Sequence, residues 1–160
     1  MIYICKRCWT DLVTWNDIEF ASDFYVCEVC GKSEIVEVDD LCANTVILLN
    51  KNGRTTDYCC EGHCYNNGVV DCAYISFTDT VPLFLINIIN NLKEYELDDC
   101  EIDLNESSVG LSPGKLITEW MSKKDITLEE RMIFRQDFNA WKTKLWINLE
   151  NELDDYFKRN

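Results

Sequence analysis

The apolar positions along the chain change their spacing from segment to segment, and this spacing predicts the elements. Segment 39–52 starts with two acids, carries apolar residues on one helical face and is followed by Gly53. These features predict a helix of about 12 residues. Segments 55–60 and 73–77 are short and rich in aromatic and β-branched residues, which predicts two strands.

A second helix is predicted from Val81 to about Lys93, with Pro82 in its first turn, where a missing N–H is harmless. The next segment, 95–104, alternates as a strand does, but its parity slips partway along. A bulge or turn at 98–99 would bring both sets of apolar side chains to the core. The order α-β-β-α-β predicts a small sheet covered by helices on one face.

The carboxyl-terminal part carries the longest helical pattern. Thr127 and Glu130 form a capping-box sequence, and the apolar residues beyond them recur every three or four positions, which predicts an amphipathic helix of about 30 residues. Its stripe consists of Phe134, Phe138, Trp141, Leu145, Leu149, Leu153 and Phe157. The helix either packs on its own sheet and ribbon or forms part of a homodimer or partner interface. A loop at 112–114 and a short helix at 115–121 are predicted before it.

Two Cys-x-x-Cys pairs near the amino terminus predict a zinc site. The first pair is Cys5 and Cys8, and the second is Cys27 and Cys30, followed by the permissive backbone of Gly31. Four thiolates at this spacing suit a closed tetrahedral Zn²⁺ site, and the short β-rich arms around them are typical of a zinc ribbon. The role of the metal would be folding, because a module this small has little core of its own.

These patterns predict an α+β protein with an N-terminal zinc ribbon, a small α/β layer and a long C-terminal amphipathic helix. We divide the 160 residues into a ribbon at 1–38, a small α/β domain at 39–110 and a helical segment at 111–160 that packs on it.

The charge balance restricts the partners. Fifteen basic residues against 29 acidic ones give a net charge of −14. Such a balance disfavours nucleic acids and anionic membranes and favours either solubility, with the acids forming a solvated surface, or a basic protein partner. Ten cysteines without a recognisable signal peptide favour the reducing cytoplasm, where thiols more often bind metals than form disulfides.

Five candidate ligands lie close together in the middle of the sequence: Cys59, Cys60, His63, Cys64 and Cys72. A second zinc site could use Cys60, His63, Cys64 and Cys72, because imidazole and thiolate both suit zinc. A catalytic thiol beside His63 is an alternative, although the sequence identifies no third group to orient the histidine. The remaining alternative is that these are buried cysteines beside a turn at Glu61-Gly62.

The run Leu49-Asn50-Lys51-Asn52-Gly53-Arg54-Thr55-Thr56-Asp57-Tyr58-Cys59-Cys60-Glu61-Gly62-His63, followed by Ala73-Tyr74-Ile75-Ser76-Phe77, resembles small uncharacterised proteins of bacteria and their phages. Those proteins have a helix, a Lys-Gly turn and a Cys-Cys-Ser-Gly-His run before an aromatic strand. The segment is more distantly similar to the wybutosine-biosynthesis methyltransferase family, which has Cys-Ser-Gly-Arg in the comparable turn. Here Glu61 replaces the serine, and His63 stands where the methyltransferases have arginine.

Three functions follow as expectations. The first is a zinc-binding, non-enzymatic interaction protein, phage-encoded and acting in the host cytoplasm, which inhibits a host defence nucleoprotein as an anti-CRISPR protein does. Segment 94–106 has seven acids and no base, and alternate strand residues lie about 6.6–6.8 Å apart, close to the phosphate spacing of a nucleic acid. The second is an RNA-modifying enzyme that uses Cys60 and His63, as the methyltransferase resemblance implies. The third is a zinc-ribbon regulator that binds nucleic acid.

Overall fold

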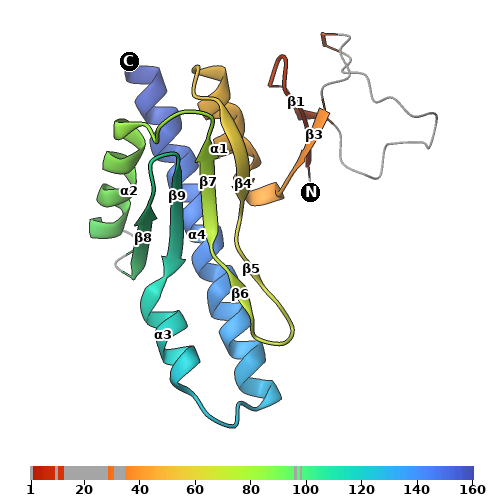
Figure 1. Ribbon diagram of the computed structural model, residues 1–160, viewed down its shortest axis with the longest axis vertical. Helices are drawn as coiled ribbons and strands as arrows, with labels where there is room; N and C mark the ends of the chain where they lie inside the picture. The colour runs from red at the N-terminus through yellow and green to blue at the C-terminus, as the bar shows by residue number, and fades with distance from the viewer. Residues whose placement is uncertain (1, 10, 13–28, 31–34, 96, 98) are drawn as a thin grey trace, which may run out of the picture.

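The computed structural model describes residues 2–9, 11–12, 29–30, 35–95, 97 and 99–160. It is a mixed α/β fold with antiparallel sheets (Figure 1). The central sheet has the order β4-β7-β9-β8, with β4 and β8 at its edges. Its strands are β4 (Thr56–Cys60), β7 (Ala73–Phe77), β8 (Cys100–Leu104) and β9 (Ser108–Pro113). The helices are α1 (Asp40–Lys51), α2 (Leu83–Tyr95), α3 (Gly114–Ser122) and α4 (Leu128–Arg159). A two-stranded hairpin of β5 (His63–Cys64) and β6 (Val70–Asp71) extends beyond β4.

One face of the central sheet forms the core. Along β7, Ala73, Ile75 and Phe77 are buried whereas Tyr74 between them is exposed, which is the alternation of a sheet covered on one side. The buried side chains pack with those of α1, α2 and α4 in a single cluster. In Figure 1, α4 runs behind the sheet along most of its length and contacts both α1 and α2. The long helix is therefore part of the same core as the sheet.

The N-terminal strands form a second, smaller sheet. Its order is β2-β1-β3, from β1 (Ile2–Cys5), β2 (Asp11–Leu12) and β3 (Ile35–Val38), all antiparallel. Ile4 packs against Ala43, Val46 and Ile47 of α1, which places this sheet beside α1 and β4 (Figure 1). We call residues 2–9, 11–12, 29–30 and 35–38 the N-terminal module.

Several predicted elements are confirmed. The helix predicted at 39–52 is α1, the strands predicted at 55–60 and 73–77 are β4 and β7, and the helix expected from Val81 is α2. This helix begins two residues later, at Leu83. In its first turn, Leu85 N donates to the carbonyl oxygen of Pro82. The strand predicted at 95–104 is shorter, because α2 continues to Tyr95 and β8 starts only at Cys100. Of the bulge predicted at 98–99, residue 98 lies outside the described part.

The predicted loop at 112–114 is wrong. Ser112 and Pro113 end β9, which pairs with β7 and β8, and α3 begins directly at Gly114. The carboxylate of Asp99 accepts hydrogen bonds from the backbone N–H groups of Lys115 and Leu116, at 2.7 and 3.3 Å. Asp99 thus satisfies the free donors at the start of α3, so that the strand passes into the helix without a linker.

The C-terminal helix is confirmed, including its capping box. Helix α4 has 32 residues, and within it Phe134, Phe138, Leu145, Trp146, Leu149 and Leu153 are buried. Trp141 and Phe157 of the predicted stripe are half-buried against the core. None of the helices in the described part of the chain combines the length and the apolar composition that a bilayer span requires.

Thr127→Ala is expected to fray the first turn of α4. The Thr127 hydroxyl accepts a hydrogen bond from Glu130 N at 3.2 Å, and the Glu130 carboxylate accepts one from Thr127 N at 2.9 Å. Losing an N-cap threonine costs about 1 kcal/mol of unfolding free energy. Urea denaturation followed by circular dichroism measures this difference. A variant as stable as the wild type would contradict the role of the cap.

The same cap should respond to acid. The hydrogen bonds from Thr127, aided by Lys123, lower the pKa of Glu130 from 4.5 to about 2. A carboxyl group whose pKa is lowered by folding stabilises the folded chain at pH values above its ordinary pKa. This stabilisation is lost as the pH falls from about 4.5 toward 2. The stability difference between wild type and Thr127→Ala should therefore shrink over that interval.

Candidate metal sites

The described part of the chain contains two groups of three side chains whose ligand atoms converge. The first is Cys5, Cys8 and Cys30, and the second is Asp39, Cys60 and His63. Within each group all ligand atoms lie within 4.8 Å of one another. Each group can therefore hold a metal ion.

The first group lies at the end of β1. Trp9 N donates to the carbonyl of Cys5 at 2.8 Å, which closes a tight turn, and Trp9 has a φ of 51°. The Sγ atoms of Cys5 and Cys30 are 3.5 Å apart. A disulfide would need about 2.05 Å, whereas two thiolates on a tetrahedral zinc ion with bonds of about 2.3 Å are roughly 3.8 Å apart. The spacing therefore excludes a disulfide between Cys5 and Cys30 and is compatible with two ligands of one metal ion. The fourth predicted ligand, Cys27, lies outside the described residues.

The second group joins two segments that are distant in the sequence. Asp39 directly precedes α1, and Cys60 and His63 flank the turn between β4 and β5. The Asp39 Oδ2 and His63 Nε2 atoms are 3.3 Å apart, with side chains that are 19% and 37% exposed. The structure therefore brings the predicted ligands Cys60 and His63 together and adds Asp39. Cys64 and Cys72, also predicted as ligands, lie outside this cluster, and Cys72 is exposed.

Asp39 occupies the N-cap position of α1 without capping it. Its Oδ2 atom instead accepts a hydrogen bond from Glu61 N at 3.2 Å. The Glu61 carboxylate in turn accepts one from Leu41 N, at the start of α1, at 3.1 Å. Each carboxylate thus binds a backbone N–H group in the other acid's segment, and the Asp39 carboxylate is left facing His63. Sequence reasoning missed Asp39 because an acid before a helix is ordinarily its cap.

Helix α4 fixes the turn at Glu61 and Gly62. Lys142 Nζ donates to the Glu61 carboxylate and also to the carbonyl of Gly62, the latter at 3.1 Å. Trp146 Nε1 donates to the carbonyl of Glu61 at 3.0 Å. Because these groups are largely buried, the turn is held rigidly against α4. Glu61 and Gly62 therefore position Cys60 and His63.

Gly62→Ala is expected to destabilise the turn more than Gly53→Ala destabilises the end of α1. Both glycines have positive φ, 88° and 74°, so both substitutions carry the backbone penalty of a left-handed conformation. A Cβ at Gly62 would also lie 3.1 Å from Ala73 N, whereas one at Gly53 meets nothing within 4 Å. We expect an extra loss of about 1–3 kcal/mol for Gly62→Ala, measured by urea denaturation. Equal losses would contradict this packing.

The thiols of this region differ in environment. Burial, followed by a hydrogen bond with Cys42, raises the pKa of Cys59 well above its ordinary value. Burial also raises the pKa of Cys60, although the N–H of Gly62 partly opposes this. Without a metal, a raised pKa keeps the Cys60 thiol protonated near neutral pH, which is unfavourable for a nucleophile. Asp39 Oδ2 lies 3.3 Å from His63 Nε2, which makes Asp39 a candidate for the orienting group that the catalytic-thiol hypothesis lacked.

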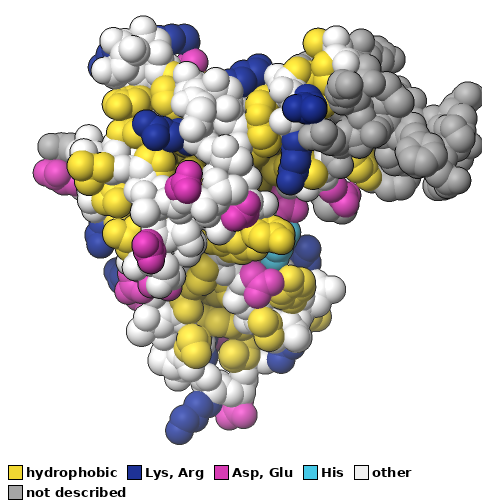
Figure 2. Space-filling model, turned by 45° about the horizontal axis from the view of Figure 1, so that its top comes forward, with side chains coloured by type: hydrophobic (Ala, Val, Ile, Leu, Met, Phe, Trp, Pro, Cys, Tyr) yellow, Lys and Arg dark blue, Asp and Glu magenta, His cyan; other side chains and the backbone are white. Residues whose placement is uncertain are grey.

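The acidic segment at 94–106 is divided among several elements. Glu94 lies on α2, Asp99 binds the start of α3, and only Glu101 and Asp103 alternate along β8. On the face shown in Figure 2, acidic side chains are dispersed among apolar and uncharged surface. Among the described residues, the longest series of alternating acids on one strand therefore has two members.

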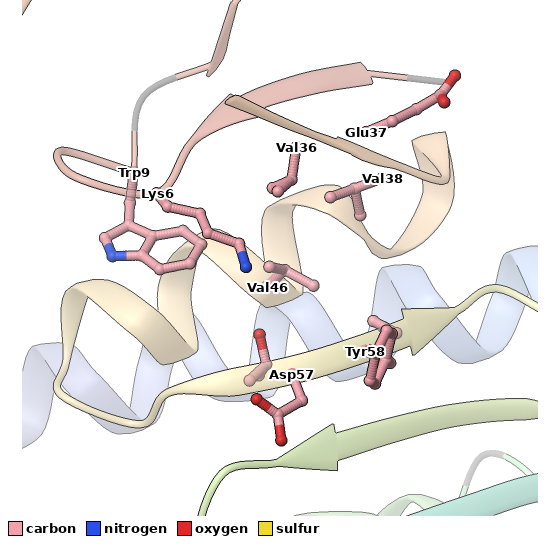
Figure 3. A pocket seen from close by; sticks show the side chains of 10 residues that line it. Lys6, Trp9, Val36, Glu37, Val38, Val46, Asp57 and Tyr58 are labelled. Carbon is pink, nitrogen blue, oxygen red and sulfur yellow. The ribbon is translucent and has the colours of Figure 1, made fainter. Parts of the chain in front are cut away.

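A groove of about 280 Å³ separates the N-terminal module from the central sheet (Figure 3). Lys6 and Trp9 line it from the module, and Asp57 and Tyr58 line it from β4. Val36 and Val38 of β3 point toward Val46 of α1 and supply an apolar interior. Tyr58 is 71% exposed, so its ring stays accessible to a partner.

The sequence and the fold were also compared with known proteins. Neither a protein-family model, nor a curated protein, nor a solved structure matches this chain.

Proposed function

We propose that the protein is a zinc-stabilised interaction protein that binds a basic protein partner in the groove between its N-terminal module and β4. The observation that carries this proposal is the groove itself, which has an apolar interior and an exposed tyrosine at its edge. Accessible aromatic side chains over apolar pockets are common anchors of protein interfaces.

The zinc ion would hold one wall of the groove in place. Cys5, Cys8 and Cys30 supply three thiolates, and we propose that Cys27 supplies the fourth, which completes the ribbon predicted from the spacing. Among the described residues, Ile4 of β1 and three residues of α1 form the buried cluster under the module, with partly buried side chains such as Trp9 and Val36 packed against it. Because so small a cluster contributes little stability, the metal would be needed to keep Trp9 and Lys6 opposite Tyr58.

The edge position of β4 suits an extended partner segment. An edge strand presents unpaired backbone groups on its outer side, and an added peptide strand can pair with them. The net charge of −14 favours a partner segment with flanking Lys or Arg, through faster association and better charge complementarity.

The narrower form of the proposal is inhibition of a host defence nucleoprotein through its basic surface, as expected of an anti-CRISPR-like phage protein. The acidic balance supports it. The division of segment 94–106 among several elements favours direct contact in the groove over imitation of a nucleic acid strand. Cleavage of target DNA by a purified defence complex, with and without the protein, tests this form.

Selection from a displayed library of random linear peptides tests the groove. We expect the wild type to enrich peptides that combine apolar and basic residues, and Tyr58→Ala to weaken the selected peptides at least tenfold. Leu104→Ala, a 48% exposed residue on the opposite edge strand, is the matched control and should bind as the wild type does. Equal loss in both variants, or enrichment of no peptides, would contradict the proposal.

A further inference from the structure

We propose that Asp39, Cys60 and His63 form a second metal centre, which binds Zn²⁺ through three protein ligands and leaves a fourth position for water. This site is separate from the N-terminal cysteines and goes beyond the interaction function. The described ligand atoms converge within 4.8 Å, and none of the three residues is fully exposed.

The chemical types of the three ligand atoms favour zinc over other metal ions. One thiolate, one imidazole and one carboxylate suit zinc, whereas magnesium and calcium prefer oxygen ligands alone. Ligand atoms about 2.0–2.3 Å from a tetrahedral ion lie roughly 3.3–3.8 Å from one another. The 3.3 Å between Asp39 Oδ2 and His63 Nε2 falls in this range. The two side chains therefore need little movement to share an ion.

Backbone donors orient two of the ligands. Gly62 N donates to Cys60 Sγ at 3.4 Å, and Glu61 N donates to Asp39 Oδ2 at 3.2 Å. Lys142 and Trp146 of α4 in turn hold the turn that carries these N–H groups. Such outer partners fix the ligands of metal sites and favour their anionic forms. The reciprocal hydrogen bonds of Asp39 and Glu61 would thus orient a metal ligand, Asp39, and also satisfy a backbone donor at the start of α1.

The fourth position has access to solvent. His63 is more than a third exposed, and the cyan of the single histidine is visible at the surface in Figure 2. A hollow of about 480 Å³ is lined by Cys60 together with Asp71 and Tyr74. Three protein ligands with an open position are typical of zinc sites that bind an exchangeable water or a small anionic ligand. When zinc binds, the Cys60 thiol releases its proton to solvent and the sulfur joins the metal as a thiolate.

The chain carries one histidine, so its ring resonances report this site directly. We expect the His63 ring signals of the full-length wild type to move when two equivalents of Zn²⁺ are added at constant pH, because the ion would bind a ring nitrogen. Ring signals at the same chemical shifts with and without zinc would overturn the proposal.

Zinc content per chain provides the second readout. The wild type should bind two ions, His63→Ala one, and Cys64→Ala two, since Cys64 is adjacent in sequence but outside the cluster. Equal zinc content in wild type and His63→Ala would overturn the second site. Peptide binding in the groove is measured separately on His63→Ala and should persist, so failure of the metal site and failure of the interaction function are distinguishable.

Discussion

Replacing Cys8 with serine is expected to unfold the N-terminal module while the central sheet and helices α1, α2 and α4 stay folded. The module has little apolar core, whereas structural zinc contributes about 10–16 kcal/mol to small zinc domains. Removing one thiolate of Cys5, Cys8 and Cys30 should forfeit most of this stabilisation. The central core should stay folded without a metal at these cysteines, because its buried residues come from other elements.

Hydrogen-exchange mass spectrometry measures this outcome segment by segment. Backbone amides of β1 and β3 should lose protection by at least a hundredfold in Cys8→Ser, and those of β7 should change little. Cys72→Ser is the control, because Cys72 is exposed and outside both ligand groups. Unchanged protection of β1 and β3 in Cys8→Ser would show that the module folds without metal.

Trp146→Ala is expected to cause the largest loss of global stability among single substitutions in α4. Trp146 is fully buried in the core, and its indole N–H donates to the carbonyl of Glu61. Truncating a buried tryptophan to alanine costs about 3–5 kcal/mol. That is a large fraction of the roughly 5–15 kcal/mol that holds an ordinary domain folded.

Two further variants separate packing from the hydrogen bond. Trp146→Phe keeps most of the apolar volume and leaves the Glu61 carbonyl without its donor, at a cost of about 1–3 kcal/mol. Ile147→Ala, at a residue that is 50% exposed on the same helix, should stay within about 0.5 kcal/mol of wild type. Urea denaturation gives all three values. Similar losses in Trp146→Ala and Ile147→Ala would contradict the core described above.

Sequence patterns correctly predicted those helices and strands whose sequence signals lie within a few neighbouring residues. Helix α1, strands β4 and β7, and the capped helix α4 follow from apolar spacing and from cap residues within a few positions of one another. Strand β9 escaped prediction because Gly110, Ser112 and Pro113 interrupt its pattern, and only pairing with β7 and β8 keeps it extended.

The two candidate metal sites also differ in how far their ligands could be predicted from local sequence. The Cys-x-x-Cys spacing places Cys5 and Cys8 in one turn, so the convergence with Cys30 was predictable from sequence. The second cluster needs Asp39 turned away from its own helix, and this follows from the contact with Glu61 and the support of α4. Contacts between residues so far apart leave no periodic trace in the sequence. Sequence reasoning therefore found Cys60 and His63 but missed Asp39.

Elemental mass spectrometry of the purified protein tests most directly whether the N-terminal cysteines bind zinc. Wild type is compared with a Cys5→Ser/Cys8→Ser double variant and with the Cys72→Ser control. We expect the double variant to contain one zinc ion fewer per chain than the wild type and the control. Equal zinc content in the wild type and the double variant, or wild-type protein whose ten cysteines all react as free thiols, would contradict a zinc site at these residues.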